Sequence, residues 1–333
     1  MYHDIHELIE QAVNLIEHGK YSQALEFLEQ AMERSEAVFG PNDTNTACIR
    51  FEIGICLYNL SKYRKSLFHF REAANTYESA ASPDYDEIAH CYNRIGSTLM
   101  RLHKHKDAKK ALQKAFEIMD RHFGPHYNTI IDCLNLGAMY MELENTKDAK
   151  NMYFKALKMM RDAEYDDNQQ ENLKAEVLYS IGVAFIEEDD YARSHMYLSE
   201  AAHIFKEEMS FNYKLQMACL SALGIAMCEM GMGERAVKVA KKALEMAQEL
   251  GNEMNIESAT LHYNIGYTLR RVGKERNAEA LEWFNKAKFL NQTTPSPNLT
   301  RLINQEKACV LRGEKAEPFY KTVNDRSHEE ETP

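Results

Sequence analysis

Residues 93–115 read NRIGSTLMRLHKHKDAKKALQKA, and the spacing of three small residues in this stretch recurs along the chain. Gly96 is followed by Ala108 after twelve residues and by Ala115 after seven more. The first small position recurs at steps of 41 to 45 residues, at Ala12, Gly54, Gly96, Gly137, Gly182, Gly224 and Gly266. The other two positions are small in the first six copies and displaced by two residues in the last. Such a period is typical of solenoid proteins.

The apolar residues around the small positions keep helical spacing. One residue before the first small position stand Ile53, Ile95, Leu136, Ile181, Leu223 and Ile265, and three residues after it stand Leu57, Leu99, Tyr140, Phe185, Met227 and Leu269. This is the period of a helix, not the two-residue period of a strand. Small residues let antiparallel helices approach closely, and a larger side chain would overpack the contact at a cost of ~1–3 kcal/mol. The sequence therefore predicts seven helical hairpins.

Turn residues place the predicted hairpins along the chain. Gly40 and Gly124 follow the ends of second helices and each precedes a proline, which is a common helix C-terminal signal. First helices are expected at roughly 3–18, 45–60, 87–102, 129–143, 173–187, 215–230 and 257–272. Asp86, Asn128 and Asn172 stand where N-caps of first helices should lie. The loop 164–172 is the one notable insertion.

The composition fits an all-α chain and narrows the class of ligand. Only 14 Gly and 7 Pro occur in 333 residues, so turns are few. The net charge of −11 argues against nucleic acid as the main ligand, because phosphate binding needs a basic surface. The seven cysteines are scattered and form no Cys-x-x-Cys pair, so we expect reduced thiols in a cytoplasmic protein. Apolar runs are too short to span a bilayer, so no membrane insertion is expected.

Sequence motifs for catalysis are not found. The chain has no phosphate-binding Gly-rich loop, no Gly-x-Ser-x-Gly elbow and no His-Glu-x-x-His helix. We therefore expect no catalytic residue, no metal ion and no cofactor. The turn around His103 and His105 and the acidic run 187–190 are interpreted as solvated turns, since neither has metal-site spacing.

The repeated pattern resembles the tetratricopeptide repeat in a long form of about 42 residues. Phe-Gly-Pro before the next helix, at 39–41 and 123–125, is similar to the repeats of kinesin light chains. Similar long repeats occur in bacterial peptide-pheromone receptors. The resemblance covers residues 3 to about 292. It implies an all-α fold, namely a right-handed α-α superhelix (a TPR solenoid) of seven helical hairpins plus a C-terminal capping helix.

The chain is expected to have three segments. Residues 1–292 form the seven-repeat array, and residues 293–313 form a linker and the capping helix. Ala308 lies 42 residues after Gly266, so this last helix resembles an unpaired first helix. Residues 314–333 are expected to be a disordered acidic tail, because they include Pro318 and end in a run of glutamates.

The resemblance implies that first helices line a concave groove. The predicted ligand-binding residues stand two residues before the small position, five residues after it, or one place from these offsets: Asn93, Arg94, Arg101, Asn135, Asn264, Arg270 and Arg271. In long-form arrays an Asn on this face often grips the backbone amide of a bound peptide, because Asn donates and accepts at once. Arginine holds carboxylates in bidentate pairs, so a partner segment with acidic ends is expected. The alternative for each residue is a merely solvated surface position.

These patterns favour a binding module over an enzyme. The main hypothesis is an adaptor or scaffold that binds a protein or peptide segment in the groove between hairpins three and seven. The alternative is a receptor for a short regulatory peptide that switches a partner protein. An enzyme is the least favoured class, because no constellation of residues supports one.

Overall fold

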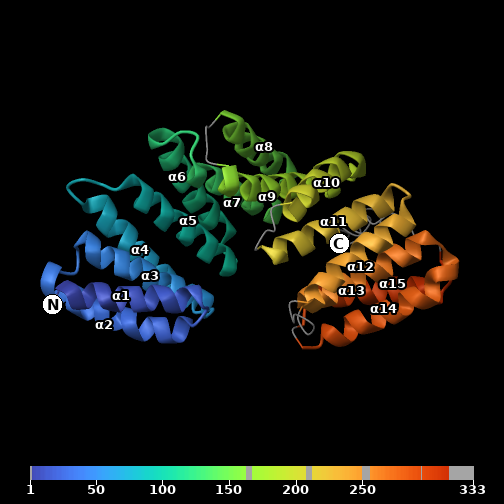
Figure 1. The fold of residues 1–333 in the computed structure, drawn as a ribbon, viewed down its shortest axis with the longest axis horizontal. Coiled ribbons are helices and arrows are strands. Elements are labelled where there is room, and N and C mark those ends of the chain that lie inside the picture. Colours follow the sequence, from blue (N-terminus) through green and yellow to red (C-terminus); the bar gives the residue numbers. More distant parts are fainter. Residues whose placement is uncertain (1, 163–166, 208–211, 250–255, 294, 315–333) are drawn as a thin grey trace, which may run out of the picture. The chain divides into compact units, whose positions relative to one another are not determined.

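The computed structural model describes residues 2–162, 167–207, 212–249, 256–293 and 295–314 (Figure 1). These residues contain fifteen α-helices, one short 3-10 helix and no strand. The chain divides into two compact units, unit 1 (Met1–Glu164) and unit 2 (Tyr165–Pro333). The predicted all-α solenoid of helical hairpins is confirmed.

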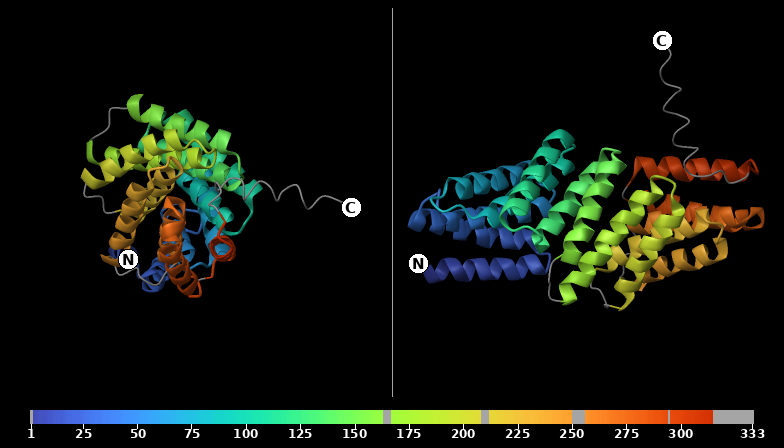
Figure 2. Two further views of the ribbon diagram at one scale, coloured as in Figure 1. Left: turned by 90° about the vertical axis from the view of Figure 1, so that its right-hand side faces the viewer. Right: turned by 90° about the horizontal axis from the view of Figure 1, so that it is seen from above.

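Unit 1 contains hairpins one to four. Its helices are α1 (Tyr2–Glu17), α2 (Tyr21–Phe39), α3 (Thr44–Asn59), α4 (Tyr63–Ser79), α5 (Tyr85–Arg101), α6 (His105–His122), α7 (Tyr127–Glu142) and α8 (Thr146–Asp162). Each odd-numbered helix packs against the even-numbered helix that follows it and, in turn, against the helix before it. Figure 2 shows these pairs from two further sides. The small residues Ala12, Ala24 and Ala31 are buried together with Leu28 in the first hairpin.

Unit 2 contains hairpins five to seven and one further helix. Its helices are α9 (Asp167–Ile186), α10 (Tyr191–Glu207), α11 (Tyr213–Glu229), α12 (Gly233–Glu249), α13 (Ile256–Val272), α14 (Asn277–Leu290) and α15 (Pro297–Leu311). The 3-10 helix η1 (Lys274–Arg276) occupies the turn in which the sequence spacing indicates two extra residues. α15 packs against α13 and α14, and its Leu299, Ile303 and Val310 join the core of this unit.

The recurring glycines lie where a second helix crosses a first helix. A Cβ atom built on Gly54 would lie 2.6 Å from the ring of Phe70, and one on Gly96 would lie 2.5 Å from Leu112. Real Cβ atoms do not approach other atoms this closely, so these positions need a residue without a side chain. The predicted role of the small residues at the helix crossings is therefore confirmed at these two sites.

The predicted helix bounds agree with the structure except near the start of α9. That helix begins at Asp167, whereas the sequence indicated a loop to residue 172. Residues 167–172 contain no Gly or Pro, so the backbone continues as helix, and the N-cap predicted at Asn172 is wrong.

The other two predicted N-caps are also wrong, by two residues each. The backbone NH of Asp86 donates to Asp84 Oδ1 at 3.1 Å, and that of Asn128 donates to His126 Nδ1 at 3.3 Å. Asp84 and His126 follow prolines, and the helices begin directly after them. Asp86 and Asn128 bond to each other instead, through the Asn128 amide at 3.0 Å.

Some predictions fall beyond this description. Residues 315–333, and with them nearly all of the predicted acidic tail, lie outside the described residues. Among the described helices, none combines the length and the apolar character needed to cross a membrane.

Candidate functional site

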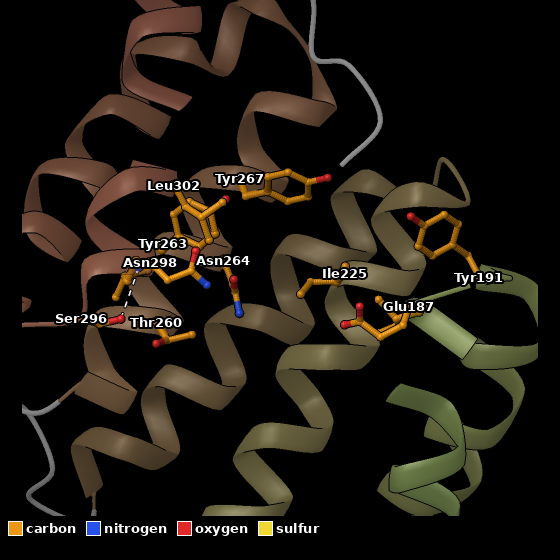
Figure 3. A pocket seen from close by; sticks show the side chains of 12 residues that line it. Glu187, Tyr191, Ile225, Thr260, Tyr263, Asn264, Tyr267, Ser296, Asn298 and Leu302 are labelled. Atoms are coloured by element: carbon orange, nitrogen blue, oxygen red, sulfur yellow. Dashed lines mark hydrogen bonds between the residues drawn. The ribbon is translucent and has the colours of Figure 1, made fainter. Parts of the chain in front are cut away.

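A pocket of about 360 Å³ lies in unit 2 on the face formed by first helices and α15 (Figure 3). It is lined by Ile186, Glu187, Tyr191, Ile225, Thr260, Tyr263, Asn264, Tyr267, Ser296, Asn298, Leu299 and Leu302. In Figure 3 the side chains of α13 lie between Leu302 and Asn298 of α15 on one side and Ile225 of α11 on the other. The pocket is thus built mainly by first helices, which carry the surface that the sequence predicted for a ligand, with Tyr191 added from the second helix α10.

Helical spacing brings the α13 residues to this face. Thr260, Tyr263, Asn264 and Tyr267 stand at positions i, i+3, i+4 and i+7, so they form one stripe along the helix. Ile265 and Leu269 lie on the opposite side and are fully buried in the core of the unit. The same pattern that packs α13 therefore also turns two tyrosines and an asparagine towards the pocket.

Asn264 is the predicted ligand-binding residue that lines this pocket. Its side chain is 8% exposed, and its Nδ2 donates to Ser221 Oγ of α11 at 2.6 Å. An amide has two N–H donors and one carbonyl acceptor, so this bond uses one of its donors. The hydrogen bond fixes the orientation of the amide at the pocket wall.

Arg271 contacts Tyr267 and forms an ion pair with Glu229 of the same chain. Its Nη2 is 2.9 Å from Glu229 Oε1 and donates to the Tyr267 hydroxyl at 2.8 Å. That hydroxyl in turn donates to Glu229 Oε1 at 2.6 Å, which links α13 to α11. Burial raises the pKa of Tyr267, so its hydroxyl keeps its proton as donor. The cluster holds one wall of the pocket.

Arg270 faces the other neighbour of α13. Its guanidinium forms an ion pair with Glu306 of α15, and the two side chains are 5% and 11% exposed. Both arginines that the sequence predicted for this end of the groove therefore already hold carboxylates of the same chain. Their predicted contact with a ligand stays a prediction.

Tyr263 is a pocket residue that the sequence analysis missed. It is 5% exposed, and its hydroxyl has no hydrogen-bond partner among the residues that the structure describes. Burial raises the pKa of this tyrosine, with Glu306 adding to the effect. It stands three residues before Gly266, whereas the predicted positions were taken mainly at two residues before and five after.

In unit 1 the predicted residues of α5 and α7 form a hydrogen-bonded chain. Asn135 Nδ2 donates to Asn93 Oδ1 at 3.0 Å, and Asn93 Nδ2 donates to Asp132 Oδ1 at 2.5 Å. Asp132 is 4% exposed, and burial raises its pKa to about 7, against the effect of the bond from Asn93. The chain joins the first helices of hairpins three and four.

The two arginines of α5 are exposed on the surface of unit 1. Arg101 Nε donates to the Tyr58 hydroxyl of α3 at 3.2 Å, and Arg94 lies close enough to Glu52 to lower its pKa, which burial raises. These exposed guanidinium groups can pair with carboxylates of another molecule. Within the described ranges no group of three or more His, Cys, Asp or Glu residues could hold a metal ion.

A family model for the tetratricopeptide repeat matches residues 7–79 and 87–162. The matched hairpins of unit 1 are tetratricopeptide repeats. The matched residues all lie in unit 1, and the helical hairpins of unit 2 continue the same tetratricopeptide spacing. The predicted resemblance is thereby confirmed. A search of curated proteins found no match.

Solved structures with the same fold have little sequence identity to this chain. The apo form of RapI has a TM-score of 0.64 at 12% identity, over 92% of this chain and 96% of that chain. The Rap conjugation gene regulator of plasmid pLS20, in complex with the Phr* peptide, has a TM-score of 0.58 at 12% identity over 90% and 75%. TPR-like repeats of a putative kinesin light chain from Podosopora anserina have a TM-score of 0.53 at 11% identity over 63% and 100%.

Proposed function

We propose that the chain is a protein-binding adaptor and that the unit 2 pocket receives an extended segment of a partner polypeptide. The observation that carries this proposal is the pocket itself, which is lined by apolar side chains of α11 and α15 together with Tyr263 and Asn264 of α13. A polypeptide offers both apolar side chains and unsatisfied backbone groups. Such a mixture of apolar wall and few placed polar groups is typical of ligand sites.

The predicted residues have different roles in this proposal. Asn264 contacts the backbone of the partner, because its amide can donate and accept at once. Arg270 and Arg271 support the pocket from behind, since each is paired with a glutamate of the same unit. On unit 1, Arg94 and Arg101 bind acidic residues of a partner, next to Asn93 and Asn135.

The second candidate function is a receptor for a short free peptide that switches a partner protein. It is favoured by one comparison, since the Rap regulator of pLS20 was solved in complex with the Phr* peptide. That argument is an analogy between folds. A receptor of this kind would change its conformation or its binding to a third protein when the peptide is added, whereas an adaptor would not.

The proposal can be tested with peptides selected from a random display library against the full chain. Ile225→Lys or Leu302→Lys places a charge at the pocket wall and should weaken the selected peptides by at least about 10-fold, because a lysine there loses hydration. Phe289→Lys is the matched control in the same unit, since Phe289 is 61% exposed and lies away from this pocket. Fluorescence anisotropy measures the affinity, and circular dichroism confirms the fold.

If Phe289→Lys abolishes binding while the two pocket variants bind normally, the partner docks on another face of unit 2. If no selected peptide depends on any pocket residue, the pocket is not a peptide site.

The unit 1 part of the proposal has its own test. Arg94→Glu together with Arg101→Glu should abolish binding of acidic selected peptides and leave the helical content unchanged, because both side chains are exposed. The control reverses the charges of Lys109 and Lys110, which lie on the second helix α6. If only the control variant loses binding, the acidic partner uses the second-helix surface.

A further inference from the structure

We propose that Tyr263 determines the specificity of the unit 2 pocket: its hydroxyl donates a hydrogen bond to a backbone carbonyl of the partner segment, and an uncharged aliphatic side chain of that segment fills the adjoining hollow. This inference rests on the proposed function of the pocket. It goes further by naming the residue that selects the ligand and the chemical class that it selects.

The three tyrosines of the pocket differ in how their hydroxyls are bonded. The Tyr191 hydroxyl donates to Asp189 at 2.8 Å, and the Tyr267 hydroxyl donates to Glu229 and accepts from Arg271. The hydroxyl of Tyr263 has no such partner within the described parts of the chain, although Tyr263 is as buried as Tyr267. A buried hydroxyl without a hydrogen bond has lost its hydration and gained nothing in return. A ligand that supplies an acceptor would restore the missing bond.

The surroundings of Tyr263 make its hydroxyl a donor. Burial, and next the carboxylate of Glu306, raise the pKa of this tyrosine, so the proton stays on the hydroxyl. The ligand must therefore present an oxygen that accepts. Glu187 is the one ionisable carboxylate among the lining residues, and no Lys or Arg lines the pocket, so a second carboxylate would be repelled. A neutral carbonyl meets both conditions.

The walls beside Tyr263 select the neighbouring side chain. Ile225 of α11 and Leu302 of α15 line the pocket on either side of α13 (Figure 3), and Leu299 of α15 is a further lining residue. A charged side chain buried among them would lose its hydration, whereas an aliphatic one would gain from the burial. Asn264 follows Tyr263 directly, so the two polar groups can read neighbouring backbone units of one extended segment.

The test uses the full chain and the tightest peptide selected from the random display library. Tyr263→Phe should leave the melting temperature unchanged or raise it, because it removes a buried hydroxyl that has no bond in the free protein. The same variant should weaken the peptide about 5- to 10-fold, which corresponds to the loss of one hydrogen bond. If Tyr263 had only a structural role, its substitution would not lower the peptide affinity while leaving the melting temperature unchanged or raised. In the peptide, lysine in place of one aliphatic residue should abolish binding.

The matched control is Tyr92→Phe in unit 1. The Tyr92 hydroxyl donates to Glu78 at 3.0 Å and accepts from Lys114, so this variant removes a hydroxyl that is already bonded. It should leave the peptide affinity unchanged and should not raise the melting temperature.

Each other outcome overturns the inference in a distinguishable way. If Tyr263→Phe lowers melting temperature and affinity together, or changes neither, Tyr263 does not read the ligand. If that variant binds normally while Ile225→Lys abolishes binding, this inference fails and the proposed function stands. If both variants bind normally, the proposed function fails with it. If lysine is tolerated at every aliphatic position of the peptide, the selected class is wrong.

Discussion

At Gly137 a methyl group in place of the hydrogen would lie 2.7 Å from Cδ1 of Tyr153, well inside contact distance. The ring of Tyr153 packs on the glycine because it stands sixteen residues further on, where the second helix crosses the first. Gly224 has the same place in hairpin six, but its counterpart is Ala240. There the nearest atom to an added methyl group lies at 3.5 Å, which is an ordinary contact. The same residue type is therefore required at one repeat and replaceable at another.

This difference predicts opposite effects of one substitution. Gly137→Ala should lower the free energy of unfolding by about 1–3 kcal/mol, because the rigid ring of Tyr153 must move. Gly224→Ala should be neutral or stabilising by up to about 1 kcal/mol, since alanine is the better helix former and space is available. Urea denaturation followed by circular dichroism measures both. Equal destabilisation by the two variants would contradict this account of the small position.

Asp132 gives unit 1 a pH dependence of stability. An aspartate in an unfolded chain has a pKa of about 3.9, and burial raises that of Asp132 to about 7 in the folded chain. Between these values the folded state binds more protons, so stability should fall as the pH rises from about 4 to about 7. Asp132→Asn stays neutral and can still accept from Asn93, so it should flatten this slope.

The measurement is the urea midpoint of the wild type and of Asp132→Asn across that pH range. Asp162→Asn, at the exposed end of α8, is the control and should keep the wild-type slope. If Asp132→Asn follows the wild-type curve, another group controls the pH dependence of stability.

The hydrogen-bonded pairs between first helices could be predicted only in part. Asn135 and Asn264 were found because they share the offset of two residues before the glycine. Their acceptors, Asn93 and Ser221, share the offset of three residues in the preceding hairpin, and Tyr263 has this second offset too. Spacing shows which residues share a face. It does not show which of them bond to each other, because that depends on how adjacent helices are turned.

At the scale of the element, α15 is held to α13 by a charged contact in an apolar place. Leu299, Ile303 and Val310 pack into the unit 2 core, and Glu306 lies on the same side between them. Its partner Arg270 is almost completely buried, so the guanidinium cannot readily recover hydration. Removing one partner of a buried pair leaves the other charge uncompensated.

Glu306→Ala should therefore destabilise unit 2 by about 3–5 kcal/mol and release α15 first. Hydrogen exchange by mass spectrometry should show faster exchange over 297–311 and unchanged exchange in unit 1. Glu314→Ala is the control, because its pair with Arg312 is exposed, and exposed pairs contribute little to stability. If the two variants exchange alike, the buried pair does not hold the capping helix.

Helices were predicted better than their ends. The period of the small and apolar residues fixes which residues face the neighbouring helix, and this is why all seven first helices were placed correctly in their central parts. The start of α9 and the three N-caps were not, because a cap depends on the local backbone where the chain enters the helix. Asp84 and His126 each follow a proline, and that signal was available in the sequence.

At the scale of the molecule, each unit has a core of its own. The apolar cluster of α1 to α3 lies within unit 1, and the cluster of α11 to α15 lies within unit 2. In repeat proteins stability is approximately a sum of terms for each repeat and for its neighbours. A fragment of residues 1–164 should therefore fold alone and unfold cooperatively.

Scanning calorimetry of this fragment and of the full chain tests that expectation. Gly137→Ala should lower the transition temperature of the fragment. In the full chain the same variant should lower the transition temperature of unit 1, whereas Glu306→Ala should lower that of unit 2. If either variant shifts the entire unfolding curve as one transition, the chain is a single cooperative body.

The bonds between Asn135 and Asn93 and between Asn264 and Ser221 give the hairpins a fixed order. Each asparagine donates to a polar side chain of the hairpin before it, and hairpins two and four have no polar side chain at the corresponding position. If hairpin four followed hairpin two, Asn135 would face Phe51, which has the position of Asn93. If hairpin seven followed hairpin four, Asn264 would face Leu134, which has the position of Ser221. Hairpins of this chain that look alike in shape are thus not interchangeable. A shuffled array would keep its helices and bury amides against apolar side chains.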